Sequence, residues 1–151
     1  MTVRDFYSML FGEFNESEFS LYYGEQLSAK EADTKPLEKR TAAYMVYVFI
    51  SQVKKEADEP SIEPAFVLKD IYECPACIRD VAQVYLKGIM TAKDRVFGVR
   101  EKVEEEEAAT IISRAFDRSK RFGGKYIDGL ILYKKKVFTI ICEKNKIGFR
   151  L

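Results

Sequence analysis

The strongest constraint on this chain is an internal duplication. Residues 37–46 (LEKRTAAYMV) and 103–112 (VEEEEAATII) share one pattern, the Ala-Ala anchor: an aliphatic residue, four mostly charged residues, Ala-Ala and an apolar stretch. Residues 3–7 (VRDFY) and 68–72 (LKDIY) share a second pattern, the aspartate anchor, at nearly the same offset, and one glycine of each copy falls between the anchors. Three matches in the same order indicate a duplicated unit of roughly 55 residues.

The second copy has the clearer pattern. A helix is predicted near residues 78–89, where one face collects Ile78, Val81, Ala82, Tyr85 and Ile89. Gly88 suits the left-handed conformation that commonly ends a helix. After a loop through Lys102, a second helix carries another apolar face, made by Ala108, Ile111, Ile112, Ala115 and Phe116. The acidic run 104–107 occupies its first turn, where carboxylates oppose the positive end of the helix dipole. We therefore expect a solvated helix start there rather than a metal or substrate site.

The first copy begins with two short predicted helices. Thr2 and Asp5 have the spacing of a capping box for a helix over roughly residues 3–11. A second short helix is expected at Glu16 to Tyr23.

The longest helix is expected at Lys35 to Lys55. Residues 44–50 within it are rich in β-branched and aromatic side chains, so a strand is the competing interpretation. The duplication favours a helix, because Ile111 and Ile112 occupy the matching positions of the second copy. We expect the two copies to share one core that contains Val46, Tyr47, Ile50, Val81, Tyr85, Ile111, Ile112 and Phe116.

The duplication divides the chain into four parts. We assign residues 1–57 to copy 1, 58–65 to a linker, 66–121 to copy 2 and 122–151 to a tail. The tail contains three β-rich runs separated by polar, lysine-rich turns, at residues 126–133, 137–142 and 147–151. The predicted fold class is therefore mainly α (α+β), with two helix-loop-helix repeats followed by a three-stranded antiparallel β-meander that packs on the helices.

Composition narrows the functions open to this chain. Hydrophobic residues make up 47% of it and charged residues 32%, which excludes a disordered protein. The chain has no histidine, and histidine is the commonest general base and metal ligand. The formal net charge of +1 lacks the basic excess of a protein that neutralises nucleic-acid phosphates. We therefore expect a protein that is not an enzyme, has no cofactor and does not bind nucleic acid.

Hydropathy indicates no transmembrane segment. The longest apolar run, at residues 42–50, is about half the length that a membrane helix needs. The N-terminal residues also lack the pattern of a signal peptide. From the chain as written we expect a cytoplasmic protein, or a cell-surface protein if a signal peptide was removed.

Two of the three cysteines, Cys74 and Cys77, form a C-x-x-C pair, and Cys142 is distant. A redox role is supported by a possible strand at residues 65–68 and by Pro75, which suits the first turn of a helix whose positive end stabilises a thiolate. A thioredoxin-like fold, however, needs a proline downstream of the pair, and none occurs. A zinc site would lack its fourth ligand. We favour structural cysteines that are not a working disulfide couple, and keep a redox-active pair as the alternative.

The second copy resembles a divergent S-layer homology (SLH) repeat. The family pattern runs Phe-x-Asp-Val, then Trp-Ala opening a helix, Gly-Ile after it, a loop with Phe-x-Pro, and Ile-Thr-Arg-x-Glu-Ala-Ala opening the second helix. The matching residues here are Leu68-Lys69-Asp70-Ile71, Ala76-Cys77, Gly88-Ile89-Met90, Phe97-Gly98-Val99, Val103 and Glu107-Ala108-Ala109. The first copy matches in part, at Asp5, Gly24, Leu37, Ala42 and Ala43. The resemblance covers about 110 residues and not the tail.

The resemblance implies binding of an anionic, pyruvylated polymer of the bacterial cell wall, with the family's Thr-Arg-x-Glu arginine at the anion. In copy 2 the Thr and Arg positions hold Glu104 and Glu105, whose carboxylates repel an anion. In copy 1 they hold Glu38 and Lys39, with Arg40 adjacent. The candidate ligand site is therefore Lys39 and Arg40, at a helix N-terminus, where free N–H groups attract anions. A solvated pair of cations is the alternative interpretation.

Two classes of function stay open. The first is a non-enzymatic binding or structural module of SLH-like build, whose partner is an anionic cell-wall polysaccharide or another protein. The second is a small thiol-redox protein that uses Cys74 and Cys77. Thiol alkylation separates the two, because a reactive pair needs an exposed and stabilised thiolate.

Overall fold

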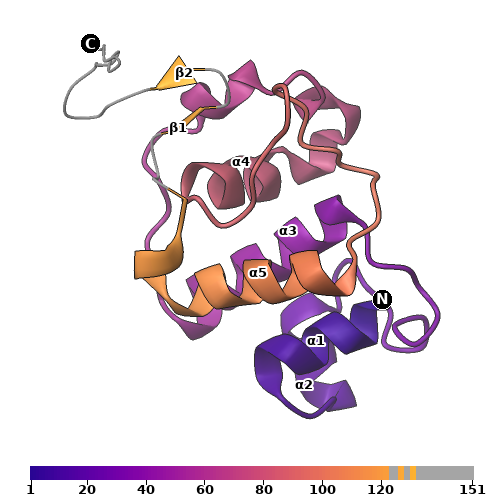
Figure 1. Cartoon of the computed structure of the whole chain (residues 1–151). Helices are drawn as coiled ribbons and strands as arrows, with labels where there is room; N and C mark the ends of the chain where they lie inside the picture. The colour runs from indigo at the N-terminus through magenta and orange to yellow at the C-terminus, as the bar shows by residue number, and fades with distance from the viewer. Residues whose placement is uncertain (123–125, 128–129, 132–151) are drawn as a thin grey trace.

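The computed structural model describes residues 1–122, 126–127 and 130–131. Its main elements there are α1 (Val3–Phe11), α2 (Glu16–Tyr23), α3 (Lys39–Val48), α4 (Ile78–Leu86), α5 (Glu105–Phe116), β1 (Tyr126–Ile127) and β2 (Leu130–Ile131). A π-helical turn extends α3, and 3₁₀ turns occupy four other segments; their bounds are Phe49–Val53, Glu63–Val67, Ile71–Glu73, Pro75–Cys77 and Arg118–Lys120. Figure 1 shows α3 and α5 in the middle of the molecule, with α1 and α2 on one side and α4 on the other.

The first two helices are confirmed, and their capping residues explain where they start. The Thr2 hydroxyl accepts a hydrogen bond from the Asp5 N–H at 3.2 Å, and the Asp5 carboxylate accepts one from the Thr2 N–H at 3.0 Å. This reciprocal pair is a capping box. The Asn15 side chain accepts from the Glu18 N–H at 2.8 Å and starts α2 in the same way.

The long helix is confirmed as a helix and not a strand, but it starts later than predicted. It begins at Lys39 instead of Lys35, and its π-helical extension ends at Val53. The start moves because Pro36 pairs with Thr2 in an isolated antiparallel bridge, which keeps the preceding backbone extended. The extension contains an i+5 hydrogen bond from the Lys54 N–H to the Phe49 carbonyl at 3.1 Å.

Three helices start in equivalent ways, although the sequence indicates only a twofold repeat. Each of α1, α3 and α5 begins two residues after Met1, Leu37 or Val103. These three residues join in a short ladder, because the Leu37 N–H donates to the Met1 carbonyl at 3.0 Å and the Val103 N–H donates to the Leu37 carbonyl at 2.9 Å. The Ala-Ala anchor therefore links equivalent structures.

The aspartate anchor does not link equivalent structures. Residues 3–7 are helical, whereas residues 68–72 form a turn that leads into the 3₁₀ segment Ile71–Glu73. In the three-helix arrangement α1 is instead the counterpart of α3 and α5. Phe6, Ala42 and Ala108 fall at matching positions, five residues after each ladder residue, and all three are fully buried.

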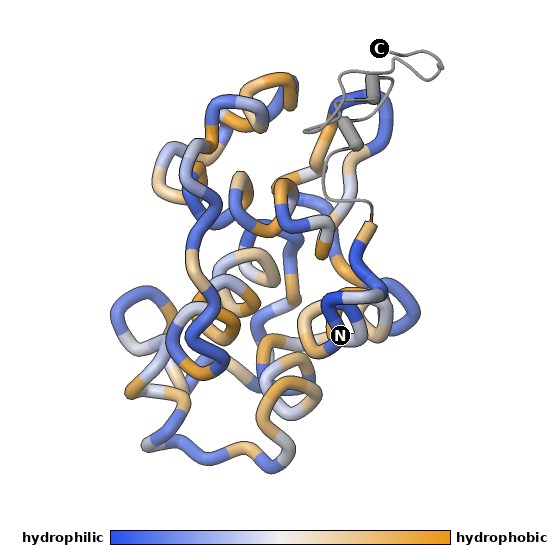
Figure 2. Tube along the Cα trace, turned by 90° about the vertical axis from the view of Figure 1, so that its left-hand side faces the viewer, coloured by the Kyte–Doolittle hydropathy of each residue, from blue (hydrophilic) through white to orange (hydrophobic). Residues whose placement is uncertain are grey.

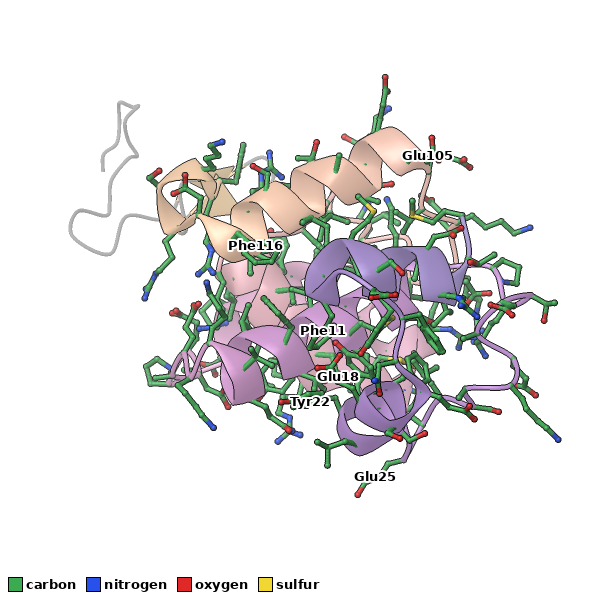
Figure 3. The ribbon with its side chains drawn as sticks, turned by 90° about the horizontal axis from the view of Figure 1, so that it is seen from below. Phe11, Glu18, Tyr22, Glu25, Glu105 and Phe116 are labelled. Carbon is green, nitrogen blue, oxygen red and sulfur yellow. A yellow bond between two sulfur atoms is a disulfide. The ribbon has the colours of Figure 1, made fainter. Side chains whose placement is uncertain are left out.

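The core forms around α3, and aromatic side chains fill its lower part. Phe11 of α1 stacks on Tyr22 of α2, with ring centroids 5.5 Å apart, and Figure 3 labels both on the underside of the molecule. The buried Tyr23 hydroxyl donates to the Met45 carbonyl of α3 at 2.8 Å. Along the helices, hydrophobic and hydrophilic residues alternate at short intervals (Figure 2), as expected for amphipathic helices on one core.

Of the eight expected core residues, six are buried. Ile112 is only partly buried against the core, and Phe116 is 46% exposed. Phe116 lies at the last residue of α5, where it covers Phe49 at a ring distance of 5.2 Å instead of entering the interior.

The segment predicted as a linker makes close contacts with α4. The Gln83 side chain exchanges two hydrogen bonds with the backbone of Glu59, at 2.8 and 3.2 Å. The possible strand at residues 65–68 is instead part of a 3₁₀ turn that begins beside Pro64. In copy 2, α4 ends near Gly88, which has a φ of +76° and accepts a hydrogen bond from the Phe122 N–H at 2.8 Å. A Cβ there would collide with the Phe122 backbone, so glycine is required.

The predicted fold class is wrong in its β part. The described residues are mainly helical, and the single strand expected at 126–133 is instead two strands of two residues, β1 and β2, paired antiparallel as Tyr126↔Ile131 and Ile127↔Leu130. Asp-Gly stands between them in the sequence, and this dipeptide favours a tight turn over a continuous strand. The runs expected at 137–142 and 147–151 lie outside the described residues. Among the described residues, no helix has the length and apolar character to cross a membrane.

Candidate functional site

A polar groove runs across one face of α3. It consists of two adjoining hollows of about 260 and 180 Å³ that share Gln26, Tyr44, Ala76 and Asp80. Side chains from the end of α2 and the loop after it form one wall, α3 forms the floor, and the start of α4 forms the other wall. The groove therefore joins parts of both sequence copies.

Asp80 is the most unusual group in this groove. The residue is only 7% exposed, yet its carboxylate has no hydrogen-bond or ion-pair partner among the described residues. Burial raises the pKa of Asp80 to about 6, and the neighbouring charge of Arg79 offsets only part of that shift. Buried polar groups are nearly always hydrogen-bonded, and perturbed carboxyls in a cleft are candidates for a functional role. Asp80 is therefore the leading candidate for contact with a ligand or substrate.

Tyrosines line the floor of the groove beside Asp80. Burial, with the nearby charge of Asp80, raises the pKa of Tyr44. The Tyr47 hydroxyl donates to both carboxylate oxygens of Asp58 at 2.9 Å, and the guanidinium of Arg79 stands over the Tyr47 ring at 5.3 Å from its centroid. This side of the groove thus offers flat aromatic faces, a cation and a carboxylate within one surface.

Cys74 and Cys77 lie at the rim of the smaller hollow and are joined by a disulfide, with their Cα atoms 5.2 Å apart. Both residues are partly exposed. Cys77 is the N-cap of α4, and Pro75 opens the 3₁₀ turn before it, as its sequence position predicts. Asp80 follows Cys77 by three residues, so the disulfide and the unpaired carboxylate share one helix start.

The two cations predicted from the SLH resemblance lie in different surroundings. The Lys39 ammonium pairs with Glu101 at 3.2 Å and with Glu107 at 3.6 Å, away from the groove. The Arg40 guanidinium pairs with Glu38 at 2.7 Å and also lines the smaller hollow together with Lys35. The structure therefore brings Arg40, but not Lys39, to the groove.

The loop of copy 2 caps the start of α3. The Lys39 N–H donates to the Glu101 carbonyl at 2.8 Å, and the Arg40 N–H donates to the Val99 carbonyl at 3.0 Å. Asp70 holds this loop, because its carboxylate accepts from the backbone of Phe97, Gly98 and Val99 at 2.8–3.2 Å. Burial opposes ionisation of Asp70, but these hydrogen bonds outweigh it and lower its pKa. The first N–H groups of α3 are consequently occupied by protein carbonyls.

A buried ion cluster, made by Glu56, Lys87 and Arg121, lies away from the groove. Arg121 binds the Glu56 carboxylate with two hydrogen bonds at 2.7 and 2.9 Å, and the Lys87 ammonium lies 3.1 Å from it. Each of the three side chains is less than a tenth exposed. Burial alone raises the pKa of Glu56, but the hydrogen bonds from Arg121 and Lys87 dominate and lower it to about 2. The Lys87 ammonium also lies 3.9 Å from the Glu59 carboxylate, so two cations face two carboxylates. Buried charges that are matched in this way hold segments of the fold together.

Sequence reasoning missed both Asp80 and the ion cluster. Asp80 does follow a cysteine by three residues at a predicted helix start, but this spacing does not indicate that its carboxylate is buried without a partner. Glu56, Lys87 and Arg121 are too far apart in the sequence for any local pattern to join them. The acidic run does start α5 as predicted, with Glu105, Glu106 and Glu107 in its first turn. The described residues contain no group of three or more His, Cys, Asp or Glu side chains placed to hold a metal ion.

Comparisons with known protein families, with curated proteins and with solved structures found no match for this chain.

Proposed function

We propose that this chain is a binding module of SLH-like build and that its groove holds a segment of an anionic polysaccharide. The observation that carries the proposal is the buried, unpartnered carboxylate of Asp80 at the centre of the groove. A sugar hydroxyl donates the hydrogen bond that this carboxylate lacks, which compensates the cost of burying it.

The rest of the groove suits the same class of ligand. Lys35, Arg40 and Arg79 line its two hollows and supply positive charge for an acidic substituent such as a carboxylate. Tyr22 and Tyr44 supply flat faces on which a sugar ring packs. The resemblance to SLH repeats points to the same ligand, a pyruvylated polymer of the bacterial cell wall.

The position of the groove changes which cations are expected to bind the polysaccharide. Lys39 is engaged with two glutamates, so its charge is neutralised before any ligand arrives. Arg40 stays a candidate, because it lines the groove while it contacts Glu38. Arg79 joins it as a second cation, from the start of α4 and in the larger of the two hollows.

The proposal is tested by titrating purified, pyruvylated cell-wall polysaccharide into the full chain. We expect binding by wild type, a loss of affinity of about 10-fold for Arg40→Ala and for Arg79→Ala, and no change for Arg118→Ala. Arg118 is an exposed arginine outside the groove and serves as the matched control. A 10-fold loss is about 1.4 kcal/mol, which is near the lower end of the value of one hydrogen bond to a charged group. A wild type that does not bind, or groove variants that bind as well as the control, would remove the polysaccharide as the ligand and leave a protein partner.

A further inference from the structure

The groove contains a second chemistry that polysaccharide binding does not use. We propose that Cys74–Cys77 is an exchangeable disulfide that reacts with a dithiol substrate, and that Asp80 gives a proton to the departing thiolate of Cys77. This activity goes beyond the binding function proposed above and does not rest on it, although both use the same groove.

Geometry brings the reacting groups together. Cys74, Cys77 and Asp80 line one hollow of about 180 Å³. Cys77 is the N-cap of α4 and Asp80 is its third helical residue, so both stand in the first turn of the same helix. Both cysteines are partly exposed, so a thiolate of the substrate can reach the disulfide from the groove.

The surroundings favour a thiolate at this position. The positive end of α4 points at Cys77, and Lys35 and Arg40 line the same hollow. Both features stabilise thiolates in proteins. Stabilising the reduced form in this way makes a disulfide easier to reduce.

Asp80 is suited to proton transfer because nothing else holds its carboxyl. The titratable and charged groups near it are Arg79 on α4, Tyr44, Tyr47 and Arg40 on α3, Tyr22 at the end of α2, Lys35 and Glu25 from the first loop region, and the two cysteines. None of them forms a hydrogen bond or ion pair with Asp80 among the described residues. Burial raises the pKa of Asp80 to about 6, so both of its protonation states are accessible near neutral pH.

The proposed step is balanced as follows. One thiolate of the substrate attacks the sulfur of Cys74, a mixed disulfide forms, and the bond between Cys74 and Cys77 breaks. The electron pair of that bond stays on Cys77, and the carboxyl of Asp80 protonates it. The second thiolate of the substrate then attacks the substrate sulfur of the mixed disulfide, and the electron pair of the broken bond stays on Cys74. The two protons that the substrate thiols lost to water on ionisation return to the protein, one to the Cys74 thiolate and one to the Asp80 carboxylate. The substrate dithiol is oxidised to a disulfide, and the protein gains two thiols.

The test measures thiol–disulfide exchange in the full chain without any polysaccharide. The oxidised protein is mixed with reduced dithiothreitol over a range of pH, and free thiols are trapped by alkylation and counted by mass spectrometry. A parallel assay follows the reduction of insulin disulfides by the reduced protein. We expect a pH profile with an inflection near 6 for wild type. Asp80→Asn should lack that inflection and react at least about 10-fold more slowly.

Two controls separate proton transfer from a structural effect. Asp94→Asn changes an exposed aspartate outside the groove and is expected to keep the wild-type rate and pH profile. Asp80→Glu keeps a carboxyl at the site, and a partial return of the inflection supports proton transfer. Circular dichroism verifies that each variant is folded.

Two results overturn the proposal. In the first, wild type and Asp80→Asn exchange at the same rate across the pH range. In the second, the disulfide of the folded protein resists dithiothreitol and the reduced protein does not accelerate insulin reduction. Either result leaves Cys74–Cys77 as a structural bond and leaves the polysaccharide proposal untouched.

Discussion

Two buried carboxylates in this molecule have opposite surroundings. Glu56 accepts two hydrogen bonds from Arg121 and pairs with Lys87, and its pKa is lowered to about 2 although burial opposes this. Asp80 is buried to a similar degree, has no hydrogen-bond partner among the described residues, and has a pKa raised to about 6 by burial. Burial is common to both sites, so the difference between them comes from their partners.

That difference separates a structural site from a functional one. The Glu56 cluster joins the segment after α3, the end of α4 and the segment after α5, and the protein itself satisfies all its charges. The Asp80 site has the same cost of burial without the compensation, and it opens into a groove. Proteins keep such an unpaired carboxyl mostly where a ligand or a reaction uses it.

The largest expected effect comes from breaking the satisfied site. Arg121→Ala leaves Glu56 and Lys87 buried with one cation missing, and removing one partner of a buried ion pair costs about 3–5 kcal/mol. We expect the free energy of unfolding, measured by urea titration, to fall by this amount. Arg118→Ala, three residues away and exposed, is the matched control and should change stability by less than about 0.5 kcal/mol. An Arg121→Ala protein as stable as this control would show that the cluster does not hold the fold together.

The pH dependence of stability gives a second way to separate the two sites. The pKa of Glu56 is lower in the folded protein than its ordinary value of 4.5, so its stabilisation is present above pH 4.5 and is lost as pH falls towards 2. A shift of this size corresponds to about 3 kcal/mol. Glu56→Gln should therefore flatten the acid limb of the stability curve, measured by urea titration from pH 2 to 5. An acid limb that is equally steep in the variant would contradict the assignment.

Asp80 should change the free energy of unfolding with pH in the opposite direction to Glu56. Its pKa is higher in the folded protein than its ordinary value of 3.8, so its contribution is fully present below about pH 4 and is lost as pH rises through 6. At pH 7 the folded state therefore carries a penalty of about 2–3 kcal/mol. Asp80→Asn should be more stable than wild type at pH 7 and of similar stability at pH 4. A variant that is less stable than wild type at pH 7 would mean that Asp80 has a structural partner.

The contrast between the two sites also explains what the sequence could predict. A local pattern was sufficient for α1, because the capping residues Thr2 and Asp5 act within three residues of the helix start. The helix α2 was also predicted, and its cap Asn15, which the sequence analysis did not use, is equally local. Local patterns were insufficient for the ladder that joins Met1, Leu37 and Val103, since hydrogen bonds between distant segments leave no local pattern. The twofold alignment therefore missed that α1 is the counterpart of α3 and α5.

The candidate site residues also divide into those that the sequence indicated and those that only the fold revealed. Resemblance to a family pointed to the start of α3, but there the loop held by Asp70 already occupies the first backbone N–H groups. The C-x-x-C pair was visible in the sequence, and the absence of a downstream proline favoured a structural role for it. The importance of the pair changed only when the fold placed an unpaired Asp80 and two cations in the same hollow. Burial without a partner is a property of the packed structure, so no spacing rule could have predicted it.

The smallest expected effect comes from the residue that links the two regions. The Tyr47 hydroxyl, on the floor of the groove, donates to Asp58, which follows Glu56 by two residues in the segment that the ion cluster holds. Tyr47→Phe keeps the ring under Arg79 and removes only this hydrogen bond, so we expect a loss of about 1 kcal/mol in the free energy of unfolding. Asp58→Asn keeps a side chain that can still accept from Tyr47 and should cost less. If Tyr47→Phe also weakens polysaccharide binding while Arg121→Ala does not, binding in the groove depends on the Tyr47–Asp58 hydrogen bond rather than on the ion cluster. If both variants weaken binding equally, the two regions act as one unit, and the division between structural and functional carboxylates fails.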